Sequence, residues 1–512
     1  MSHRKTGPAG RIRTLLGIPL FLSLGLLALQ LLTAGRYGIF CDEMYYVAIS
    51  KRLAWGAVDH PPLVDAVTWL SRLLFGDALL GLRLWPALAG AMTVMLTADL
   101  ARRLGGRHLA QGLAALAILA GPAFLALFGT LSMNAFDILL CTLALQILVR
   151  ILNRPSPRLW LAFGLVAGIG LENKYTMGVL GLGALAGLLA TPARRELRRP
   201  WPYLAALIAG LIFLPHVLWQ ARHDWPVLEF MANAQRYKNQ PLSPLGFFGQ
   251  LALGLNPLTL LLWAPGLIAL FARRWRPLGI LVAVGLLTYL LGRSKFYYVM
   301  PFFPLLLAAG AAWWERRLAG WRPRWPKPAL LGAIALTGAL LVPYGVPLLS
   351  VKAFIRYGDA LGLTRHLKLE RADRVDLPLH FAYRFGWEEM VDQVAGAYHA
   401  LPAEDRARCT ILASSYNKAA AIDYFGPVRG LPPALATQNQ YGLWGPGQQS
   451  GEVSLCVGFR QEVLAKYFAV VEPVALVEHP YAHPNETGYW ICVCREPYHA
   501  FQVIWPSIRV FI

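Results

Sequence analysis

The chain has 512 residues, of which 56% are hydrophobic and only 15% charged, and its mean hydropathy is +0.45. This composition is too apolar for a water-soluble protein of this length and indicates a membrane protein with many spans. A net charge of +20 would suggest nucleic-acid binding in a cytosolic protein. Here most arginines lie in clusters between apolar segments, which is typical of the loops of a membrane protein.

Eleven apolar segments precede residue 350, each near the ~20 residues that a bilayer core requires. The first, residues 15–34, follows a basic stretch that includes His3, Arg4 and Lys5 and lacks a small-residue cleavage site, so we expect an uncleaved helix. Several segments are short or interrupted by Gly and Pro. The other ten are expected at residues 80–101, 109–128, 134–152, 158–172, 175–192, 202–219, 247–271, 278–292, 297–314 and 328–349.

The loops between these segments alternate in charge. One set carries arginine clusters, as does the N-terminus: Arg102, Arg103, Arg107; Arg150, Arg154, Arg158; Arg194, Arg195, Arg198, Arg199; Arg273, Arg274, Arg276; Arg316, Arg317, Arg322, Arg324, Lys327. The opposite set has fewer cations and more acids. The positive-inside rule therefore places the N-terminus in the cytoplasm, and an odd number of spans places the C-terminal part outside.

The loop after the first segment carries acids where the chain leaves the membrane. It reads G-I-F-C-D-E-M-Y-Y from Gly38 and D-H-P-P from Asp59. Carboxylates at a membrane surface are costly unless they bind or react, so Asp42 and Glu43 are the candidate catalytic residues. The structural alternatives are that this pair caps a helix at residues 44–53, and that Asp59 and His60 form a local turn.

Other polar residues fall on the same predicted side of the membrane and are expected to line one cavity with the first loop. Such a cavity offers acids for a nucleophile and cations for an anionic group, which is what transfer off a phosphate requires. Its further members are Asn134, Asp137, Glu172, Lys174, His216, Arg222, His223, Asp224, Arg293, Lys295, Tyr297 and Tyr298.

Two alternatives stay open for parts of this set. Lys295, Tyr297 and Tyr298 are also typical of an anchor at the membrane interface. Asp59 and His60 with His216, His223 and Asp224 supply metal-ligand types, but no fixed short spacing, so no metal site is assigned and a divalent metal stays an open alternative.

The hydropathy falls from about residue 350, which divides the chain into a transmembrane part, 1–349, and a soluble part, 350–512. Residues 385–401 have apolar positions at helical spacing, with Glu388 and Glu389 in the first turns. Strands are expected at residues 409–413, 453–459, 470–476 and 489–494, and a helix at 417–424. The alternation predicts a small α/β domain.

Four of the six cysteines, Cys409, Cys456, Cys492 and Cys494, fall in this soluble part. If it lies outside the cytoplasm, one disulfide is compatible with them, and so are buried free thiols in strands, because no spacing specifies a pairing.

Several motifs together resemble bacterial GT-C glycosyltransferases, the relatives of protein O-mannosyltransferases, of the aminoarabinose transferase of lipid A and of the rhizobial lipid A galacturonosyltransferases. They are the first-loop pattern with H-P-P-L, R-L-W-P-A-L-A-G-A-M-T-V at 83–94, L-E-N-K-Y-T at 171–176, K-F-Y-Y-V-M-P-F-F-P at 295–304, I-L-A-S-S-Y-N-K-A-A-A-I-D-Y-F-G-P at 411–427 and N-Q-Y-G-L-W-G-P at 439–446. The resemblance spans nearly the whole chain.

The resemblance implies an inverting transfer of one sugar from a polyprenyl-phosphate donor to an acceptor at the periplasmic face of a bacterial inner membrane. The acceptor would be lipid A, another cell-envelope glycan or a protein, and the reaction would be independent of metal or only loosely linked to it.

Matched position by position, Asp42 corresponds to the acid that activates or orients the acceptor, with Glu43 its neighbour. Lys295, Tyr297 and Tyr298 match the segment that contacts the donor phosphate.

Further positions carry donor-binding roles on the same basis. Asn134 and Asp137 fall where many relatives have T/S-D or P-D. Lys174 is a further candidate for the donor as a cation of the predicted cavity. Asp59 stands where relatives often have an acid, and His60 where they often have Lys. A neutral imidazole binds an anion poorly unless a nearby acid raises its pKa.

Two other classes of protein remain in view, a transporter or flippase for a lipid-linked sugar and a non-catalytic envelope assembly protein. A transporter predicts charges near mid-membrane and two related halves. This sequence concentrates its charges at one face and has no repeated halves, which favours the transferase.

Overall fold

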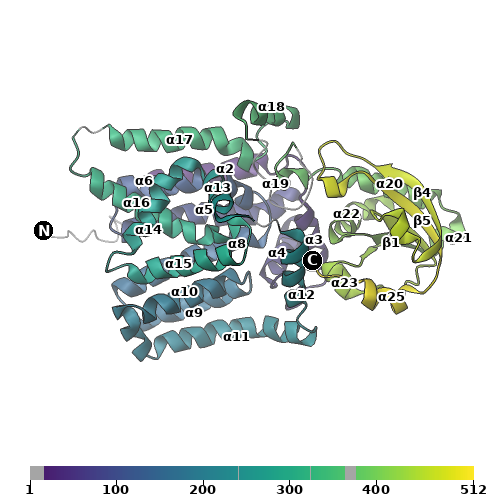
Figure 1. Cartoon of the computed structure of the whole chain (residues 1–512), viewed down its shortest axis with the longest axis horizontal. Coiled ribbons are helices and arrows are strands. Elements are labelled where there is room, and N and C mark those ends of the chain that lie inside the picture. The colour runs from purple at the N-terminus through teal and green to yellow at the C-terminus, as the bar shows by residue number, and fades with distance from the viewer. Residues whose placement is uncertain (1–16, 240–241, 323–324, 364–375) are drawn as a thin grey trace. The chain divides into compact units, whose positions relative to one another are not determined.

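The computed structural model describes residues 17–239, 242–322, 325–363 and 376–512 (Figure 1). The predicted basic N-terminal stretch and Arg324 lie outside the described residues. The chain divides into two compact units, which we call the bundle unit (Met1–Gly35, Arg83–Val217 and Pro241–Ser350) and the loop unit (Arg36–Leu82, Leu218–Gln240 and Val351–Ile512). The segment after the first span therefore packs with the C-terminal part of the chain.

The apolar segments form helices close to the predicted positions. These are α2 (Ile18–Thr33), α5 (Leu79–Arg103), α6 (His108–Leu119), α7 (Pro122–Phe128), α8 (Met133–Asn153), α9 (Pro157–Leu171), α10 (Thr176–Leu189), η1 (Pro192–Arg198), α11 (Trp201–Arg222), α13 (Pro244–Leu255), η3 (Pro257–Thr259), α14 (Leu260–Leu270), α15 (Arg276–Leu291), η4 (Phe296–Phe302), α16 (Phe303–Leu318) and α17 (Pro326–Gly345).

Within the described residues, five helices are long and apolar enough to cross a membrane, or up to eight if each bent pair counts as one span. The helices α2, α9 and α15 are apolar but shorter. A multi-pass membrane protein is therefore confirmed, and the count of eleven spans stays a prediction.

Proline breaks three of the predicted segments. The helices α6 and α7 meet at 67° before Pro122, α10 and η1 meet at 108° before Pro192, and the helices on either side of Pro257 meet at 104°. Proline has no N–H to donate and restricts the residue before it, so a helix ends there and a new one begins. Asn256, at φ +74°, accepts the Leu258 N–H through its side chain and so caps the second helix.

Glycines allow neighbouring helices of the bundle unit to approach closely. A Cβ on Gly310 of α16 would lie 1.8 Å from the Leu262 carbonyl oxygen of α14, and one on Gly187 of α10 would lie 2.2 Å from the Pro277 carbonyl oxygen of α15. Small residues at such crossings are how membrane helices gain packing without a hydrophobic driving force.

The loop unit contains the remaining elements. Its helices are α3 (Cys41–Ser50), α4 (Leu63–Phe75), α12 (Pro226–Asn233), η2 (Ala234–Lys238), α18 (Val351–Leu361), α19 (Leu379–Ala382), α20 (Trp387–Ala400), α21 (Ala403–Ala407), α22 (Tyr416–Phe425), η5 (Pro427–Arg429), α23 (Asn439–Trp444), α24 (Gln461–Leu464), η6 (Pro484–Glu486) and α25 (Phe501–Ile508). Its strands are β1 (Cys409–Ala413), β2 (Ala434–Ala436), β3 (Val453–Val457), β4 (Phe468–Val477) and β5 (Tyr489–Pro497).

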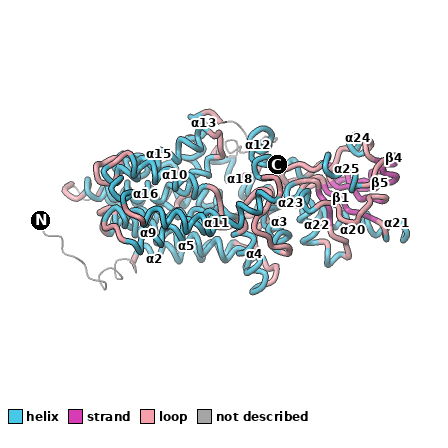
Figure 2. The backbone as a smooth tube through the Cα atoms, turned by 90° about the horizontal axis from the view of Figure 1, so that it is seen from below, coloured by secondary structure: helices cyan, strands magenta, loops and turns pink. Residues whose placement is uncertain are grey.

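The five strands form one sheet in the order β2-β1-β3-β5-β4. The strand β1 pairs in parallel with β2 and β3, whereas β5 pairs antiparallel with β3 and β4. These are the strands drawn in magenta in Figure 2. The predicted C-terminal α/β part is confirmed, but β2 was not predicted, because three residues are too few to show alternation.

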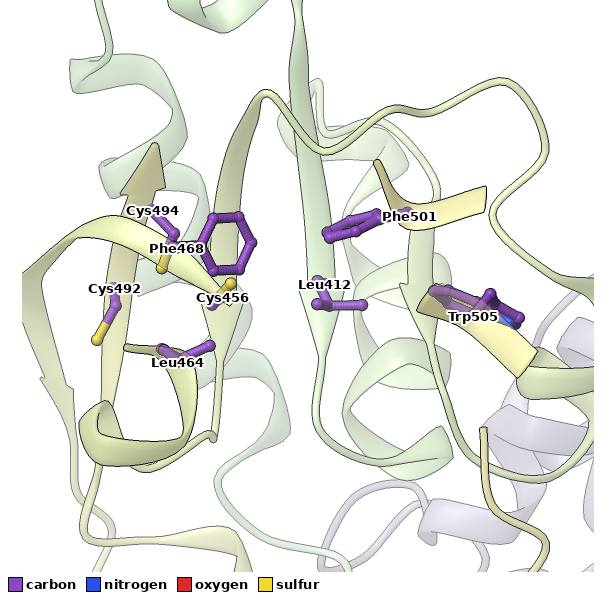
Figure 3. Close-up of a cluster of buried hydrophobic side chains, with 8 residues drawn as sticks. All are labelled: Leu412, Cys456, Leu464, Phe468, Cys492, Cys494, Phe501 and Trp505. Carbon is purple, nitrogen blue, oxygen red and sulfur yellow. The ribbon is translucent and has the colours of Figure 1, made fainter. Parts of the chain in front are cut away.

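The helices α20 and α22 pack on the sheet and on each other. A core cluster contains Leu412, Cys456, Leu464, Phe468, Cys492, Cys494, Phe501 and Trp505 (Figure 3). All six cysteines are free thiols, and those of β3 and β5 are fully buried in this core, as the free-thiol alternative expects.

Candidate functional site

The helix α3 begins at Cys41 and not at residue 44, so both predicted catalytic acids lie in its first turn. The N-cap is Phe40, whose N–H donates to the Glu43 carboxylate at 2.9 Å. The Glu43 side chain is completely buried. Because Glu43 caps the helix, the capping alternative accounts for one acid of the pair and leaves Asp42 for another role.

Asp42 is half-buried and is contacted from a distant part of the chain. The Tyr416 hydroxyl, on the first residue of α22, donates to Asp42 Oδ1 at 3.2 Å. Burial raises the pKa of Tyr416 well above its usual value, with the charge of Asp42 adding to the effect, so the hydroxyl stays a donor. The Cys41 thiol lies 3.7 Å from the same carboxylate oxygen.

His60 lies between two carboxylates of the same loop. Its Nδ1 is 3.2 Å from Asp59 Oδ1, and its Nε2 is 3.1 Å from both oxygens of Asp65 on α4. The imidazole is completely buried. Burial favours the neutral ring, but the charges of Asp65 and Asp59 outweigh it and raise the pKa of His60 well above its usual value.

The pKa values of the two carboxylates of this triad are shifted in opposite directions. Burial works against the charged form of both, yet the nearby imidazolium lowers the pKa of Asp59, whereas burial prevails at Asp65 and raises its pKa. The carboxylates approach opposite ring nitrogens and do not converge on one point. No group of three or more metal-ligand side chains suited to a metal ion occurs among the residues that the structure describes.

A chain of hydrogen bonds connects this triad to helix α23 in the C-terminal part of the chain. Tyr45 donates to Asp59 Oδ1 at 3.0 Å and accepts the backbone N–H of Gln440 at 3.0 Å. The Gln440 side chain in turn accepts the Val58 N–H at 3.1 Å. The loop also forms a tight turn at residues 57–60, in which the Ala57 N–H donates to the His60 carbonyl at 3.0 Å. We therefore expect the positions of Asp59 and His60 to depend on the C-terminal part of the chain.

A second polar cluster lies within the bundle unit. Asn134 and Asp137 face the same side of the first turn of α8, and Lys174 comes from the connection between α9 and α10. The Lys174 ammonium is 2.6 Å from Asn134 Oδ1, 3.9 Å from Asp137 Oδ2 and 4.2 Å from the centre of the Tyr298 ring. The structure thus brings three of the predicted donor-phosphate residues together.

Lys295 and Tyr297, two further predicted residues of this unit, lie at the start of η4. Lys295 is its N-cap, and Tyr297 packs edge-on against Tyr298 at 5.0 Å. His216, considered as a metal ligand, instead shares a hydrogen bond of 2.9 Å with the Tyr175 hydroxyl. The Lys174 ammonium of the second polar cluster has three N–H donors, and its contacts with Asn134 and Asp137 use at most two of them.

Sequence reasoning did not single out Asp65, Tyr45, Tyr416 or Gln440 as site residues. Asp65 carried a signal, since it follows His60 by five residues at the start of a helix. Tyr416 lies in the quoted S-S-Y-N-K motif, but nothing local indicates that it contacts Asp42.

The family described as dolichyl-phosphate-mannose-protein mannosyltransferase matches residues 59–219. The chain is 38% identical over 71 residues to the lipopolysaccharide core galacturonosyltransferase RgtA of Rhizobium johnstonii, and 25% identical over 210 residues to the lipid A galacturonosyltransferase RgtD of the same organism. These matches cover 14% and 41% of this chain and 14% and 44% of the two relatives.

The structure is similar to that of ArnT from Cupriavidus metallidurans bound to undecaprenyl phosphate, with a TM-score of 0.57 and 16% identity. The similarity covers 95% of this chain and 98% of ArnT. The chain has the GT-C glycosyltransferase fold. The resemblance inferred from the first-loop and K-x-Y-Y motifs is thereby confirmed at the level of the fold.

Proposed function

We propose that the protein is an integral membrane glycosyltransferase that moves one sugar from a polyprenyl-phosphate donor to an acceptor, with inversion. The observation that carries the proposal is the environment of Asp42, a half-buried carboxylate held by a tyrosine hydroxyl beside a second acid already engaged in capping. Such a carboxylate is suited to accept or orient the proton of an incoming hydroxyl.

In the proposed step, the acceptor oxygen attacks the anomeric carbon and its proton passes to Asp42. The bond between the anomeric carbon and the phosphate oxygen breaks, and its electron pair leaves with the polyprenyl phosphate. Cations stabilise the charge that develops on this phosphate. We assign that role to Lys174 and Lys295, with Tyr297 and Tyr298 contacting the donor phosphate and Asp137 holding Lys174. We assign positioning of the first loop to Asp59 and His60.

The rhizobial relatives are described as acting on lipopolysaccharide core and lipid A, which supports an envelope glycolipid as the acceptor. The bound undecaprenyl phosphate of ArnT supports a polyprenyl-phosphate donor. The proposal places the protein in a bacterial inner membrane, with a cytoplasmic N-terminus and a periplasmic C-terminal part.

The function is tested by comparing envelope glycolipids of a deletion strain and its parent by mass spectrometry. We expect a species in the parent whose mass exceeds the mutant's by one sugar, and the mass difference names that sugar. The purified protein in nanodiscs should then transfer this sugar from its polyprenyl phosphate to the mutant glycolipid. Identical glycolipids together with no transfer in vitro would contradict the proposal.

Tyr416→Phe tests how Asp42 is held. A hydrogen bond to a charged group contributes about 1.5–3 kcal/mol, so we expect kcat to fall about tenfold or more while KM for the donor changes little. Tyr424→Phe is the matched control, since Tyr424 lies on the same helix and donates to the Asp77 carbonyl at 2.8 Å, away from Asp42. Equal losses in the two variants would show that Tyr416 serves only to hold α22 in place.

A further inference from the structure

The loop that connects β4 to β5, residues 478–488, which we call the hairpin loop, makes a buried ion pair with the first turn of α22. The Lys418 ammonium of α22 lies 2.5 Å from Glu486 Oε2, and the two side chains are only 4% and 5% exposed. The same ammonium donates to the Asn485 carbonyl at 3.1 Å and lies 4.7 Å from the centre of the Tyr489 ring. The partners of the Lys418 charge thus come from the end of the hairpin loop and the start of β5.

Glu486 also contacts the neighbouring residue of α22. Asn417 donates through its side chain to Glu486 Oε1 at 3.4 Å, so each carboxylate oxygen engages one of two successive residues. Gly458, at φ +82°, leaves room for this arrangement, because a Cβ there would lie 2.6 Å from Cε of Lys418. Tyr416 directly precedes the two residues and is the first residue of α22. Glu486 therefore holds the turn of the helix that carries Tyr416.

The hairpin loop also reaches the residues that support the start of α3. The completely buried His483 stacks on Tyr383, with ring centres 4.1 Å apart and planes at 13°. The Tyr383 carbonyl accepts the backbone N–H of Cys41 at 3.3 Å. Cys41 is the first residue of α3, and the first N–H groups of a helix have no partner within the helix. Asp42 follows Cys41, so the hairpin loop supports both sides of the hydrogen bond between Asp42 and Tyr416.

A buried ion pair adds geometry to a fold more than it adds stability. The attraction between the two charges roughly offsets the cost of taking them out of water, so apolar side chains of similar size would stabilise a fold about equally well. An ammonium and a carboxylate, however, bond only in a few relative orientations. The Tyr416 hydroxyl is 3.2 Å from Asp42 Oδ1, which is long for a hydrogen bond between oxygens, so a small shift of either helix would break the contact.

We propose that Glu486 is a positioning residue, which holds Tyr416 at the Asp42 carboxylate by engaging Asn417 and Lys418 at once. The hairpin loop then acts as a brace between the starts of α22 and α3. Glu486 does not contact the substrates in this scheme and acts only through Tyr416. The inference rests on the proposed function, in which Asp42 takes the proton of the acceptor hydroxyl.

The first test requires no enzymatic activity. The full chain, in nanodiscs, carries 3-fluorotyrosine only at position 416, and Asp42→Ala gives the ¹⁹F resonance of this tyrosine without its acceptor. We expect Glu486→Gln, which removes the charge and keeps the shape, to move the resonance toward that position. Glu472→Gln is the matched control and should leave the resonance unchanged, because Glu472 is an exposed residue of β4 that pairs with Arg495 of β5 at 3.4 Å.

The second test measures sugar transfer. We expect Glu486→Gln to lower kcat by about threefold to tenfold, the range for coupled neighbouring groups, with little change in KM for the donor. In the Tyr416→Phe background the same substitution should cause no further loss, because the hydrogen bond that Glu486 positions is already absent. An equal loss in both backgrounds would mean that Glu486 acts elsewhere and would overturn the proposal.

The ¹⁹F measurement separates this inference from the proposed function. A resonance that Glu486→Gln leaves in place, or that Glu486→Gln and Glu472→Gln move equally, would overturn the positioning role. If Glu486→Gln does not fold, the double variant Lys418→Met with Glu486→Met replaces the pair by apolar side chains of similar volume, and the same shift is expected of it. The expected shifts in a protein that transfers no sugar would support the positioning of Tyr416 and contradict the proposed function.

Discussion

Asp42→Asn is expected to lower the rate of sugar transfer by about 10²–10⁴-fold, the range for loss of a positioned general base. The amide has the shape of the carboxylate and still accepts the hydrogen bond from Tyr416, so the fold should be unchanged. It cannot take the proton of the acceptor hydroxyl. The measurement is kcat in nanodiscs with the polyprenyl-phosphate donor, at equal protein content.

Substitutions of two other acids of the first loop show whether the expected loss of activity is specific to Asp42. Asp77→Asn is the control, because Asp77 is exposed and pairs with Arg72 at 2.5 Å. Glu43→Gln decides between the two predicted catalytic acids, since the glutamine oxygen can still accept the Phe40 N–H. If Glu43→Gln reduces kcat as strongly as Asp42→Asn, catalysis depends on both. If Asp42→Asn retains turnover near that of the unaltered protein, the proposed role of Asp42 is wrong.

His60→Leu is expected to destabilise the first loop by about 3–5 kcal/mol, the cost of leaving a buried charge without its partner. The substitution leaves Asp59 and Asp65 buried at their sites without the imidazolium between them. The contact of Asp59 with Tyr45 is then lost, and activity should fall with it. Hydrogen exchange of the backbone amides at residues 57–65 measures the local opening.

His223→Leu is the control for this variant. His223 is half-buried in the same unit. Its one described hydrogen bond is donated by Nδ1–H to the Trp219 carbonyl at 2.8 Å, and its ring stacks on that tryptophan. We expect little change in exchange at residues 57–65. An equal effect of both variants would mean that the triad has no special part in ordering the loop.

The raised pKa of His60 also sets the direction of a pH effect. The stabilisation is fully present below pH 6.5, where the unfolded histidine is also protonated, and it is lost as the pH rises through the raised pKa of the folded state. Exchange at residues 57–65, corrected for its intrinsic pH dependence, should therefore increase at alkaline pH. The His60→Leu variant should lack this alkaline transition.

The sequence by itself determined the class of the protein and the approximate position of its membrane helices. A bilayer core admits only apolar segments of about 20 residues with their backbone paired internally, so hydropathy alone locates them. The same holds for strands β1, β3, β4 and β5, whose apolar residues mark them locally. The prolines at 122 and 257 were visible as interruptions, but the angles that they produce were not.

The first loop shows what local sequence signals leave undecided. The acids Asp42 and Glu43 are neighbours with similar chemistry, and the sequence offered catalysis or capping for the pair. Only the observed start of α3 at Cys41 divides the two roles, because the third helical position can reach back to the N-cap amide and the second cannot.

The tertiary structure alone decided the partners of these acids. Tyr416 contacts Asp42 from 374 residues away, and Gln440 supports Tyr45 from 395. Likewise, the burial of Asp65 against His60 appears only once α4 is packed against α3. Hydropathy and capping preferences depend on residues that are close in the sequence. These contacts depend on how distant segments pack together in the fold, which no local sequence pattern predicts.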